Sequence, residues 1–219
     1  SSLLPSDRAT SFSPIVSLYL WYDRDLSQLP RFCALIGTTV QWVFNRRLID
    51  IQGIQGRHPG LLSCTISAAF EEAATDAGSV IATADRELRG AFPELKDARL
   101  VDGIVLKEKQ AMLEMSSRDF SFVGEKHVGH LYHLLEKLHI KPNLTQNGAI
   151  SFLCVLDDRP EKIEKLALEA SAFLDVQATK ELSLLTIRHY NKEIFEKLTT
   201  GKTLLLRQQT PETIQVLMK

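Results

Sequence analysis

The order of hydrophobic periodicities between Ala111 and Thr179 is the strongest constraint on the fold of this chain. Period-2 segments predict strands and 3.6-residue spacing predicts helices, and the resulting order is strand-helix-strand-strand-helix-strand. This is the ferredoxin-like arrangement. The predicted strands are 111–117, 142–146, 150–156 and 176–179, and the predicted helices are Gly124–His139 and one that begins at Pro160. Asn147-Gly148 predicts a type I′ turn between the middle strands, because both residues tolerate positive φ.

The remainder of the chain also alternates between strand and helix patterns. The segment 182–218 predicts strand, short helix and two strands, which would be a partial restart of the same unit. The N-terminal half predicts strand-strand-strand-helix-strand, with one long helix that ends before Pro93. The expected fold class is therefore α+β. It consists of an N-terminal antiparallel sheet with one long helix, followed by a ferredoxin-like βαββαβ unit and part of a second one.

The use of basic residues changes abruptly along the chain. Residues 1–100 contain nine arginines and a single lysine, Lys96, whereas residues 101–219 contain four arginines and twelve lysines. Such a step is expected when two sequences of different origin are joined, although one natural gene could also show it. We predict two domains, 1–108 and 109–219, with the second divided into 109–180 and 181–219.

The overall composition excludes several classes of protein. The formal net charge of −1 gives no global field that would attract nucleic acid or an anionic membrane. No apolar stretch reaches the roughly 20 residues of a membrane-spanning helix, and the N-terminus lacks the pattern of a signal peptide. Three distant cysteines argue against a disulfide framework and for a reducing, cytoplasmic location.

Several short patterns invite a catalytic or metal-binding interpretation. His127, His130 and His133 recur every three residues, but no Cys or carboxylate is spaced to complete a tetrahedral site, so a solvated helix face is the simpler interpretation. Thr200-Gly-Lys-Thr203 lacks the earlier glycine of a phosphate-binding loop and suits a helix C-terminal glycine before a strand. Asp157-Asp158 would cap the following helix.

One region combines groups that could hold a zwitterion. The loop 118–124 leads into a helix N-terminus, whose free N–H groups and dipole favour a carboxylate. Asn143, Gln146 and Asn147 lie around the neighbouring predicted strand and hairpin, although turn chemistry alone also explains these residues.

Four runs in the second half resemble the C-terminal ACT region of aspartokinases of the Bacteroidetes type. They are SRDFSFVGEK (117–126), IKPNLTQNGAISF (140–152), LTIRHY (185–190) and GK with LLLRQ (201–208). The resemblance spans roughly 104–219 and implies paired ACT units that bind a feedback inhibitor, lysine or threonine, in a homodimer. The effector-binding residues that it implies are Ser121, Phe122, Gly124, Glu125, Asn143, Asn147, Gly148 and Ala149.

The first half is similar to another family. SPIVSLYLWYDR (13–24), VQWVFN (40–45), SAA (67–69) and AFPE (91–94) resemble the middle section of FAD-dependent squalene-associated desaturases of the amine-oxidase superfamily. In that family this section faces the substrate, so the resemblance implies an apolar substrate surface, for which Trp21, Tyr22, Trp42 and Phe44 are the candidates. The period-2 placement of these aromatic residues is explained at least as well by plain sheet packing. The nucleotide-binding and flavin-contacting motifs of that family are missing from this sequence. We therefore expect no cofactor for this chain and no catalysis by it alone.

Together the two resemblances give one principal expectation and one alternative. The principal expectation is an amino-acid-binding regulatory region of an aspartokinase, fused to a non-catalytic flavoenzyme fragment. The alternative is a fragment of an FAD-dependent oxidoreductase that contributes an isoprenoid-binding surface.

Overall fold

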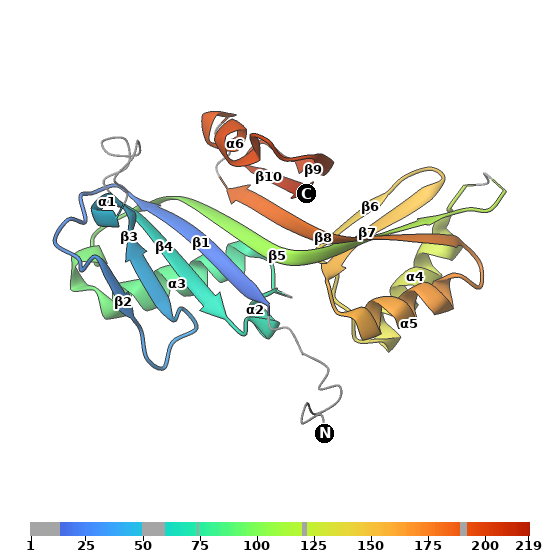
Figure 1. Cartoon of the computed structure of the whole chain (residues 1–219), viewed down its shortest axis with the longest axis horizontal. Coiled ribbons are helices and arrows are strands. Elements are labelled where there is room, and N and C mark those ends of the chain that lie inside the picture. The colour runs from blue at the N-terminus through green and yellow to red at the C-terminus, as the bar shows by residue number, and fades with distance from the viewer. Residues whose placement is uncertain (1–13, 50–59, 74, 120–121, 189–191) are drawn as a thin grey trace, which may run out of the picture.

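The computed structural model describes residues 14–49, 60–73, 75–119, 122–188 and 192–219, which contain ten strands, six α-helices and a 3₁₀-helix at Pro93–Leu95. The strands lie in one sheet, and the helices cover parts of both faces (Figure 1). In chain order the elements are β1 (Ile15–Tyr22), β2 (Phe32–Ala34), β3 (Trp42–Asn45), α1 (Arg46–Ile49), β4 (Leu61–Ser67), α2 (Phe70–Ala73), α3 (Ala77–Ala91), β5 (Leu100–Ser116), α4 (Glu125–Lys137), β6 (Leu144–Asn147), β7 (Ser151–Asp157), α5 (Pro160–Ala170), β8 (Asp175–Arg188), α6 (Lys192–Thr199), β9 (Leu204–Gln209) and β10 (Thr213–Met218).

The predicted ferredoxin-like unit is confirmed. Its strands lie in the order β6-β7-β5-β8, and every neighbouring pair is antiparallel. The first and third strands of the unit are thus central, which is the ferredoxin-like order. Helices α4 and α5 pack on one face over a core that includes Leu113, Met115 and Phe152. The α+β fold class expected from the sequence is therefore correct.

The C-terminal segment repeats the first part of this topology. Strand β8, helix α6 and strands β9 and β10 follow in chain order, and the sheet order β8-β10-β9 matches that of the first three ferredoxin-like strands. The N-terminal half of β5 lies beside β8, where a fourth strand would lie. Strands β5 and β8 therefore belong to both units. Strand β5 is the first strand of the ferredoxin-like unit and takes the fourth position in the C-terminal unit, and strand β8 is the fourth strand of the former and the first strand of the latter.

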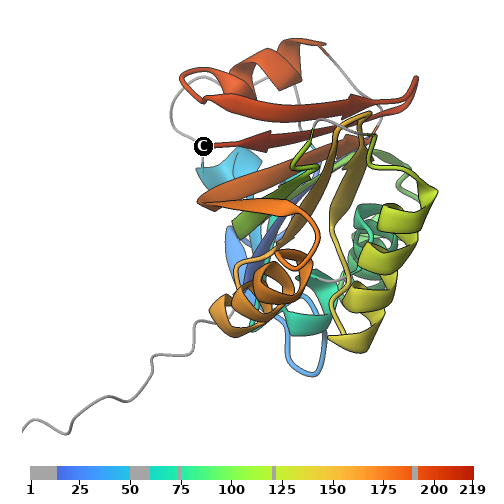
Figure 2. The same cartoon turned by 90° about the vertical axis from the view of Figure 1, so that its right-hand side faces the viewer.

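The N-terminal strands extend the same sheet. Their order is β2-β3-β4-β1-β5, all antiparallel, and α3 covers one face over a core that includes Leu18, Leu20, Ile81 and Leu88. The helix begins after Asp76, whose Oδ1 accepts a hydrogen bond from Ser79 N at 3.0 Å. A separate core under α6 includes Trp21, Ile104, Phe195 and Val216. Figure 2 shows α4 and α5 on one side of the long strands, and α6 with β9 and β10 on the other.

The long strands β5 and β8 each carry a bulge where the two halves of the molecule meet. Gly103–Lys107 pair with Arg188–Leu184 in regular register, Gln110 pairs with Leu182, and Met112 pairs with Thr179. One extra residue on β5 is thus compensated by one on β8. Lys109 and Glu181 have φ values of 53° and 58°, the left-handed conformation often found at bulges.

These bulges explain the main difference from the predicted elements. The sequence predicts separate strands before and after residues 108–110 and 180–181, whereas the structure has two continuous strands. Positions 108 and 180, at which we predicted domain boundaries, lie inside these strands, and the boundaries themselves stay predictions. The predicted long helix from Phe70 is divided into α2 and α3 because Asp76 caps a new start. Among the described residues, no helix is long and apolar enough to cross a bilayer.

Candidate functional site

The structure brings together the two segments that the sequence analysis singled out for ligand binding. The backbone N–H of Val123, in the loop after β5, donates to Ala149 O at 2.8 Å, and Ser117 N donates to Ile150 O at 3.1 Å. The loop between β5 and α4 therefore lies against the β6–β7 turn. Phe122 and Ile150 remain exposed beside these contacts, at 75% and 47% of their surface.

The N-terminus of α4 is open to solvent next to this contact. Gly124 is the N-cap residue and offers no side-chain cap, and Glu125 supplies a carboxylate in the first turn. The backbone N–H groups of Glu125 and Lys126 form no hydrogen bond to another described residue. Because the helix dipole adds partial positive charge here, these groups suit a carboxylate, and Glu125 suits an ammonium.

The β6–β7 turn differs from the predicted type I′ hairpin. Asn147 pairs with Phe152, and Gly148 N donates to Ser151 O at 2.8 Å, so four residues separate the paired positions. Neither Asn147 nor Gly148 has positive φ. The turn is wider because the carbonyl groups of Ala149 and Ile150 point to the β5–α4 loop and bind it.

Asn143 does not join the other predicted effector-binding residues. It lies before β6, at the opposite end from Asn147, and its side chain is committed to an internal polar cluster. Its Nδ2 donates to Gln110 Oε1 and Asp157 Oδ1, both at 2.8 Å, and its Oδ1 accepts from Lys107 Nζ at 2.8 Å. Ser121 lies outside the described residues. The structure therefore brings Phe122, Gly124, Glu125, Asn147, Gly148 and Ala149 to one surface.

Lys107 and Gln110 are residues that the sequence analysis missed. Lys107 is only 5% exposed, and its Nζ also donates to Thr75 O at 2.8 Å. Burial lowers the pKa of this ammonium to about 8. The run Lys107–Lys109 looks like a solvated break between strands. The polar residues 107–110 interrupt an otherwise apolar β region. This interruption was the one sequence feature that could have indicated buried polar side chains here.

Two predictions about polar residues fare differently. Asp157 and Asp158 do not cap α5, because Arg159 is its N-cap residue and Asp157 is held by Gln110 and Asn143. Gly201 has φ of 74° after α6, and β9 begins at Leu204, so the predicted helix C-terminal glycine is confirmed.

Two of the three histidines on α4 pack against an aromatic ring. His127 and His130 stack on Phe173, and their ring centroids lie 6.3 and 4.6 Å from that of Phe173. No group of three metal-ligating side chains is found among the described residues.

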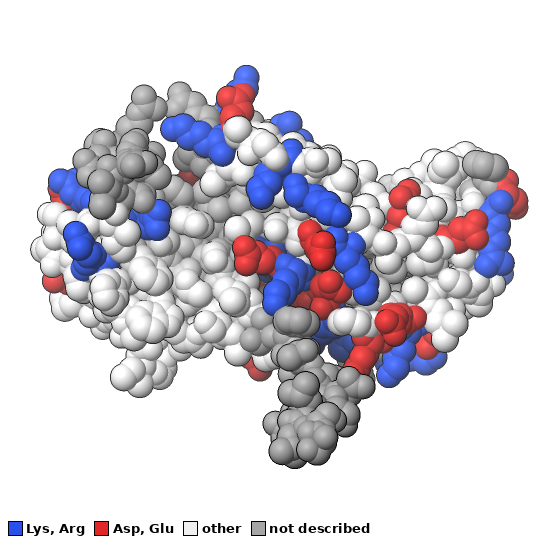
Figure 3. Space-filling view, in the orientation of Figure 1, with Lys and Arg blue, Asp and Glu red and all other residues white. Residues whose placement is uncertain are grey.

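The four residues of the predicted apolar surface lie on two faces of the sheet. Trp42 and Phe44 stack with ring centroids 6.4 Å apart on the face away from α3, and Tyr19 shares that face through Ser63. Trp21 is on the same side but is buried in the core under α6. Figure 3 shows this face over β1–β4 as mostly uncharged, and Trp42 is 43% exposed.

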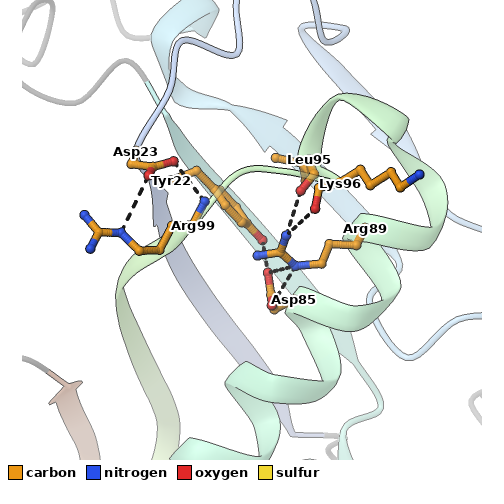
Figure 4. Close-up of polar contacts among 7 residues, drawn as sticks. All are labelled: Tyr22, Asp23, Asp85, Arg89, Leu95, Lys96 and Arg99. Carbon is orange, nitrogen blue, oxygen red and sulfur yellow. Dashed lines mark hydrogen bonds and ion pairs between the residues drawn. The ribbon is translucent and has the colours of Figure 1, made fainter.

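Tyr22 instead points to α3 and is held there. Its hydroxyl donates to Asp85 Oδ1 at 2.8 Å, and the Arg89 guanidinium binds both oxygens of Asp85 and the carbonyls of Leu95 and Lys96 (Figure 4). Burial, with a smaller contribution from Asp85, raises the pKa of the Tyr22 hydroxyl. This side chain anchors the helix to β1 and does not contribute to an open surface.

Comparison with known proteins gives structural likenesses only. No family model and no curated protein matches the chain. Among solved structures, a C-terminal regulatory domain of aspartate kinase from Porphyromonas gingivalis has a TM-score of 0.46 at 13% identity, over 54% of this chain and 86% of that one. The aspartate kinase of Clostridium acetobutylicum has a TM-score of 0.45 at 15% identity, over 53% of this chain and 30% of that one.

A third structure, aspartokinase III of Escherichia coli in complex with lysine and aspartate, has a TM-score of 0.43 at 16% identity, over 52% of this chain and 28% of that one. The chain therefore spans less than a third of the length of the C. acetobutylicum and E. coli enzymes. Each likeness concerns about half of the present chain.

Proposed function

We propose that the C-terminal half binds a small amino acid effector at the surface formed by the β5–α4 loop, the α4 N-terminus and the β6–β7 turn, and acts as a regulatory module without catalysis of its own. The observation that supports the proposal is the hydrogen bond from Val123 N to Ala149 O, which holds the loop before the uncapped N-terminus of α4 against the β6–β7 turn, where Asn147 is exposed. The motif resemblance makes lysine and threonine the first effectors to test.

The surface supplies matched groups for a zwitterion. The backbone N–H groups at the start of α4 receive the α-carboxylate, Glu125 attracts the ammonium, and Phe122 with Ile150 offers apolar contact. All of these groups are exposed on one side, so a single chain would leave the ligand half in water. A second copy of the chain completes the site, and ligand binding then stabilises a homodimer by mass action.

Calorimetric titration with lysine and threonine, together with sedimentation equilibrium, tests this proposal. One of the two amino acids should bind and strengthen self-association. Glu125→Gln should weaken binding about tenfold or more, because a charge-assisted hydrogen bond contributes roughly 1.5–3 kcal/mol. Glu164→Gln, on an exposed position of α5, is the matched control and should have no effect. A folded, dimeric protein that binds neither lysine nor threonine would contradict the proposal.

A second candidate function comes from the aromatic face of the N-terminal sheet. The exposed Trp42 stacks with the half-buried Phe44 on a mostly uncharged face, which suits a flat or extended hydrocarbon such as an isoprenoid. Farnesol should then shift the fluorescence emission of Trp42 to shorter wavelength, because it replaces water around the indole, and Trp42→Phe should abolish the response, since the other tryptophan, Trp21, is 9% exposed. An unchanged emission spectrum at saturating farnesol argues against this candidate.

A role as part of a flavoenzyme would also require FAD to co-purify with the protein or to bind to it. A protein that stays colourless after FAD addition and removal of the free flavin argues against this role.

A further inference from the structure

A cavity of about 240 Å³ lies where three parts of the molecule meet. One wall is the corner between α2 and α3, the second is the segment that leads into β6, and the third is formed by β8 and β10. This cavity lies near the start of β6, whereas the proposed effector surface lies at its far end. Its charged and polar lining includes Asp76, Lys107, Lys141, Asn143, Thr186 and Gln215, and Leu184 is an apolar lining residue.

Buried polar contacts hold two walls of this cavity in place. Lys107 is 5% exposed, and its Nζ joins Thr75 O of the α2–α3 corner to Asn143 Oδ1 of the segment before β6. Asn143 is fixed in turn by Gln110 and Asp157. Because these contacts also bind the ammonium of Lys107, that side chain shapes the cavity but is already engaged. Other groups must therefore recognise a ligand.

Asp76 and Lys141 carry opposite charges on opposite walls. Both line the cavity, yet the two described residues form no ion pair within 4.0 Å. Hydrogen bonds from Ser79 chiefly lower the pKa of Asp76, and Lys141 also contributes. The ammonium is thus near enough to act on the carboxylate electrostatically but does not contact it.

Neutral groups complete the lining between these charges. Thr186 is 6% exposed, and its Oγ1 accepts a hydrogen bond from Gln215 Nε2 at 3.3 Å. The hydroxyl proton of Thr186 has no acceptor among the described residues, so it can be donated to a ligand. Leu184 adds an apolar contact beside it. The cavity therefore offers the carboxylate of Asp76, the ammonium of Lys141 and a hydroxyl donor around one small space. The ammonium of Lys107 also lines it and interacts electrostatically with Asp76, but its hydrogen bonds go to Thr75 and Asn143.

We propose that this cavity is a second small-ligand site, which binds a short zwitterion with its ammonium at Asp76 and its carboxylate at Lys141 and the Thr186 hydroxyl. A ligand with one charge would leave the other wall without an opposite charge, and charge complementarity therefore selects the zwitterion. The site depends on residues of both halves of the chain. Ligand binding there would hold the α2–α3 corner against the start of β6.

Titration of the full chain with glycine, β-alanine and γ-aminobutyrate tests the proposal, because these zwitterions differ only in the separation of their charges. Acetate and ethylamine serve as single-charge controls. Two-dimensional NMR should show that at least one zwitterion shifts the amide signals around Asp76 and Asn143. Each single-charge compound should bind about tenfold or more weakly, as loss of one charge-assisted hydrogen bond predicts.

Two substitutions remove the charges with little risk to folding. Asp76→Asn keeps a good N-cap residue for α3, and Lys141→Gln changes an exposed side chain. Each should weaken zwitterion binding about tenfold or more. Asp97→Asn and Lys96→Gln, which alter an exposed acid and base outside the cavity lining, are the matched controls and should not change it. Asn147→Ala, at the other site, should also leave cavity binding unchanged.

Three results would overturn the proposal. The first is that none of the three zwitterions binds to the folded chain. The second is that acetate or ethylamine binds as tightly as the best zwitterion. The third is that either Asp76→Asn or Lys141→Gln, with a melting transition like that of the parent chain, binds the ligand with unchanged affinity.

Discussion

Lys109 on β5 and Glu181 on β8 occupy compensating bulges, with φ values of 53° and 58°, and the register of the two strands is the same on both sides of them. Both are non-glycine residues in the left-handed region, which costs roughly 1–2 kcal/mol for an L-residue. The bulges separate the segment of the sheet that contacts the N-terminal strands from the segment under α4 and α5.

Glycine at position 181 should therefore stabilise the fold. Glu181→Gly removes the steric cost of positive φ but adds entropy to the unfolded chain, and we expect a net gain of up to about 1 kcal/mol. Lys180→Gly, at the preceding strand position, should instead destabilise by about 0.5–1 kcal/mol. Urea unfolding of both variants measures the difference. Equal destabilisation by both would show that Glu181 is not strained.

The buried Lys107 should make stability rise with pH in the alkaline range. Burial lowers its pKa from 10.5 to about 8 in the folded state, so between these values the unfolded chain binds the extra proton and the folded chain does not. The free energy of unfolding attributable to this group then increases with pH, by up to about 1.4 kcal/mol per pH unit. The measurement is the difference between the parent chain and Lys107→Met from pH 7 to 10. A constant difference would contradict the prediction.

Asp102 should have the opposite effect at lower pH. It is 8% exposed, and burial raises its pKa from 3.8 to about 7, although its Oδ1 accepts a hydrogen bond from Gly103 N at 2.7 Å. Between these pH values the folded state binds the extra proton, so its contribution to stability falls as pH rises. Asp102→Asn cannot ionise. Its stability relative to the parent should increase by up to about 1.4 kcal/mol per unit from pH 4 to 7 and level off above.

Two glycines should respond in opposite directions to alanine. A Cβ atom at Gly60 would lie 2.2 Å from the carbonyl oxygen of Tyr22, a backbone atom that cannot move aside cheaply. Gly60→Ala should therefore destabilise by about 1–3 kcal/mol. A Cβ atom at Gly90, in α3, meets nothing within 4 Å, and Gly90→Ala should stabilise by about 0.5–1 kcal/mol. Thermal melts of the two variants should shift in opposite directions.

The hydroxyl of Tyr22 should contribute measurably to stability. Tyr22→Phe removes the hydrogen bond to Asp85 and should cost about 1 kcal/mol, whereas Asp85 keeps its contact with Arg89. Tyr19→Phe is the control, since its hydroxyl forms no hydrogen bond to another described residue. If both variants unfold at the same denaturant concentration, the hydrogen bond from Tyr22 to Asp85 in Figure 4 does not stabilise the packing of α3 on β1.

Elements with long, clear periodicity were predictable from the sequence. The segment Val16–Tyr22, the helix from Gly124 and the helix at Pro160 lie within one or two residues of the observed β1, α4 and α5. In these segments, local pattern and tertiary burial favour the same structure. The three-residue strand β2 was missed because Phe32–Ala34 is too short to show alternation.

The geometry of the predicted site could not be derived from the sequence, because it depends on contacts between segments distant in the sequence. That these residues bind an effector stays a prediction. The loop after β5 could be placed beside the hairpin only through the strand order, and the wide turn arises from its contact with that loop. Asn143 was predicted to bind the ligand both from its place beside the predicted hairpin and from the resemblance, but the buried Lys107 engages its side chain. A buried lysine at that place cannot be inferred from local pattern alone, because its partners, Thr75 and Asn143, lie on separate elements.

The sharing of β5 and β8 has a practical consequence for anyone who dissects this chain. A fragment that starts at residue 109 would lose the strand segment Gly103–Lys107 that pairs with Leu184–Arg188 of β8. That part of β8 would become a bare sheet edge with unpaired N–H and C=O groups, which recruits strands from other molecules. Self-association of such a fragment would therefore report the cut and not a native interface.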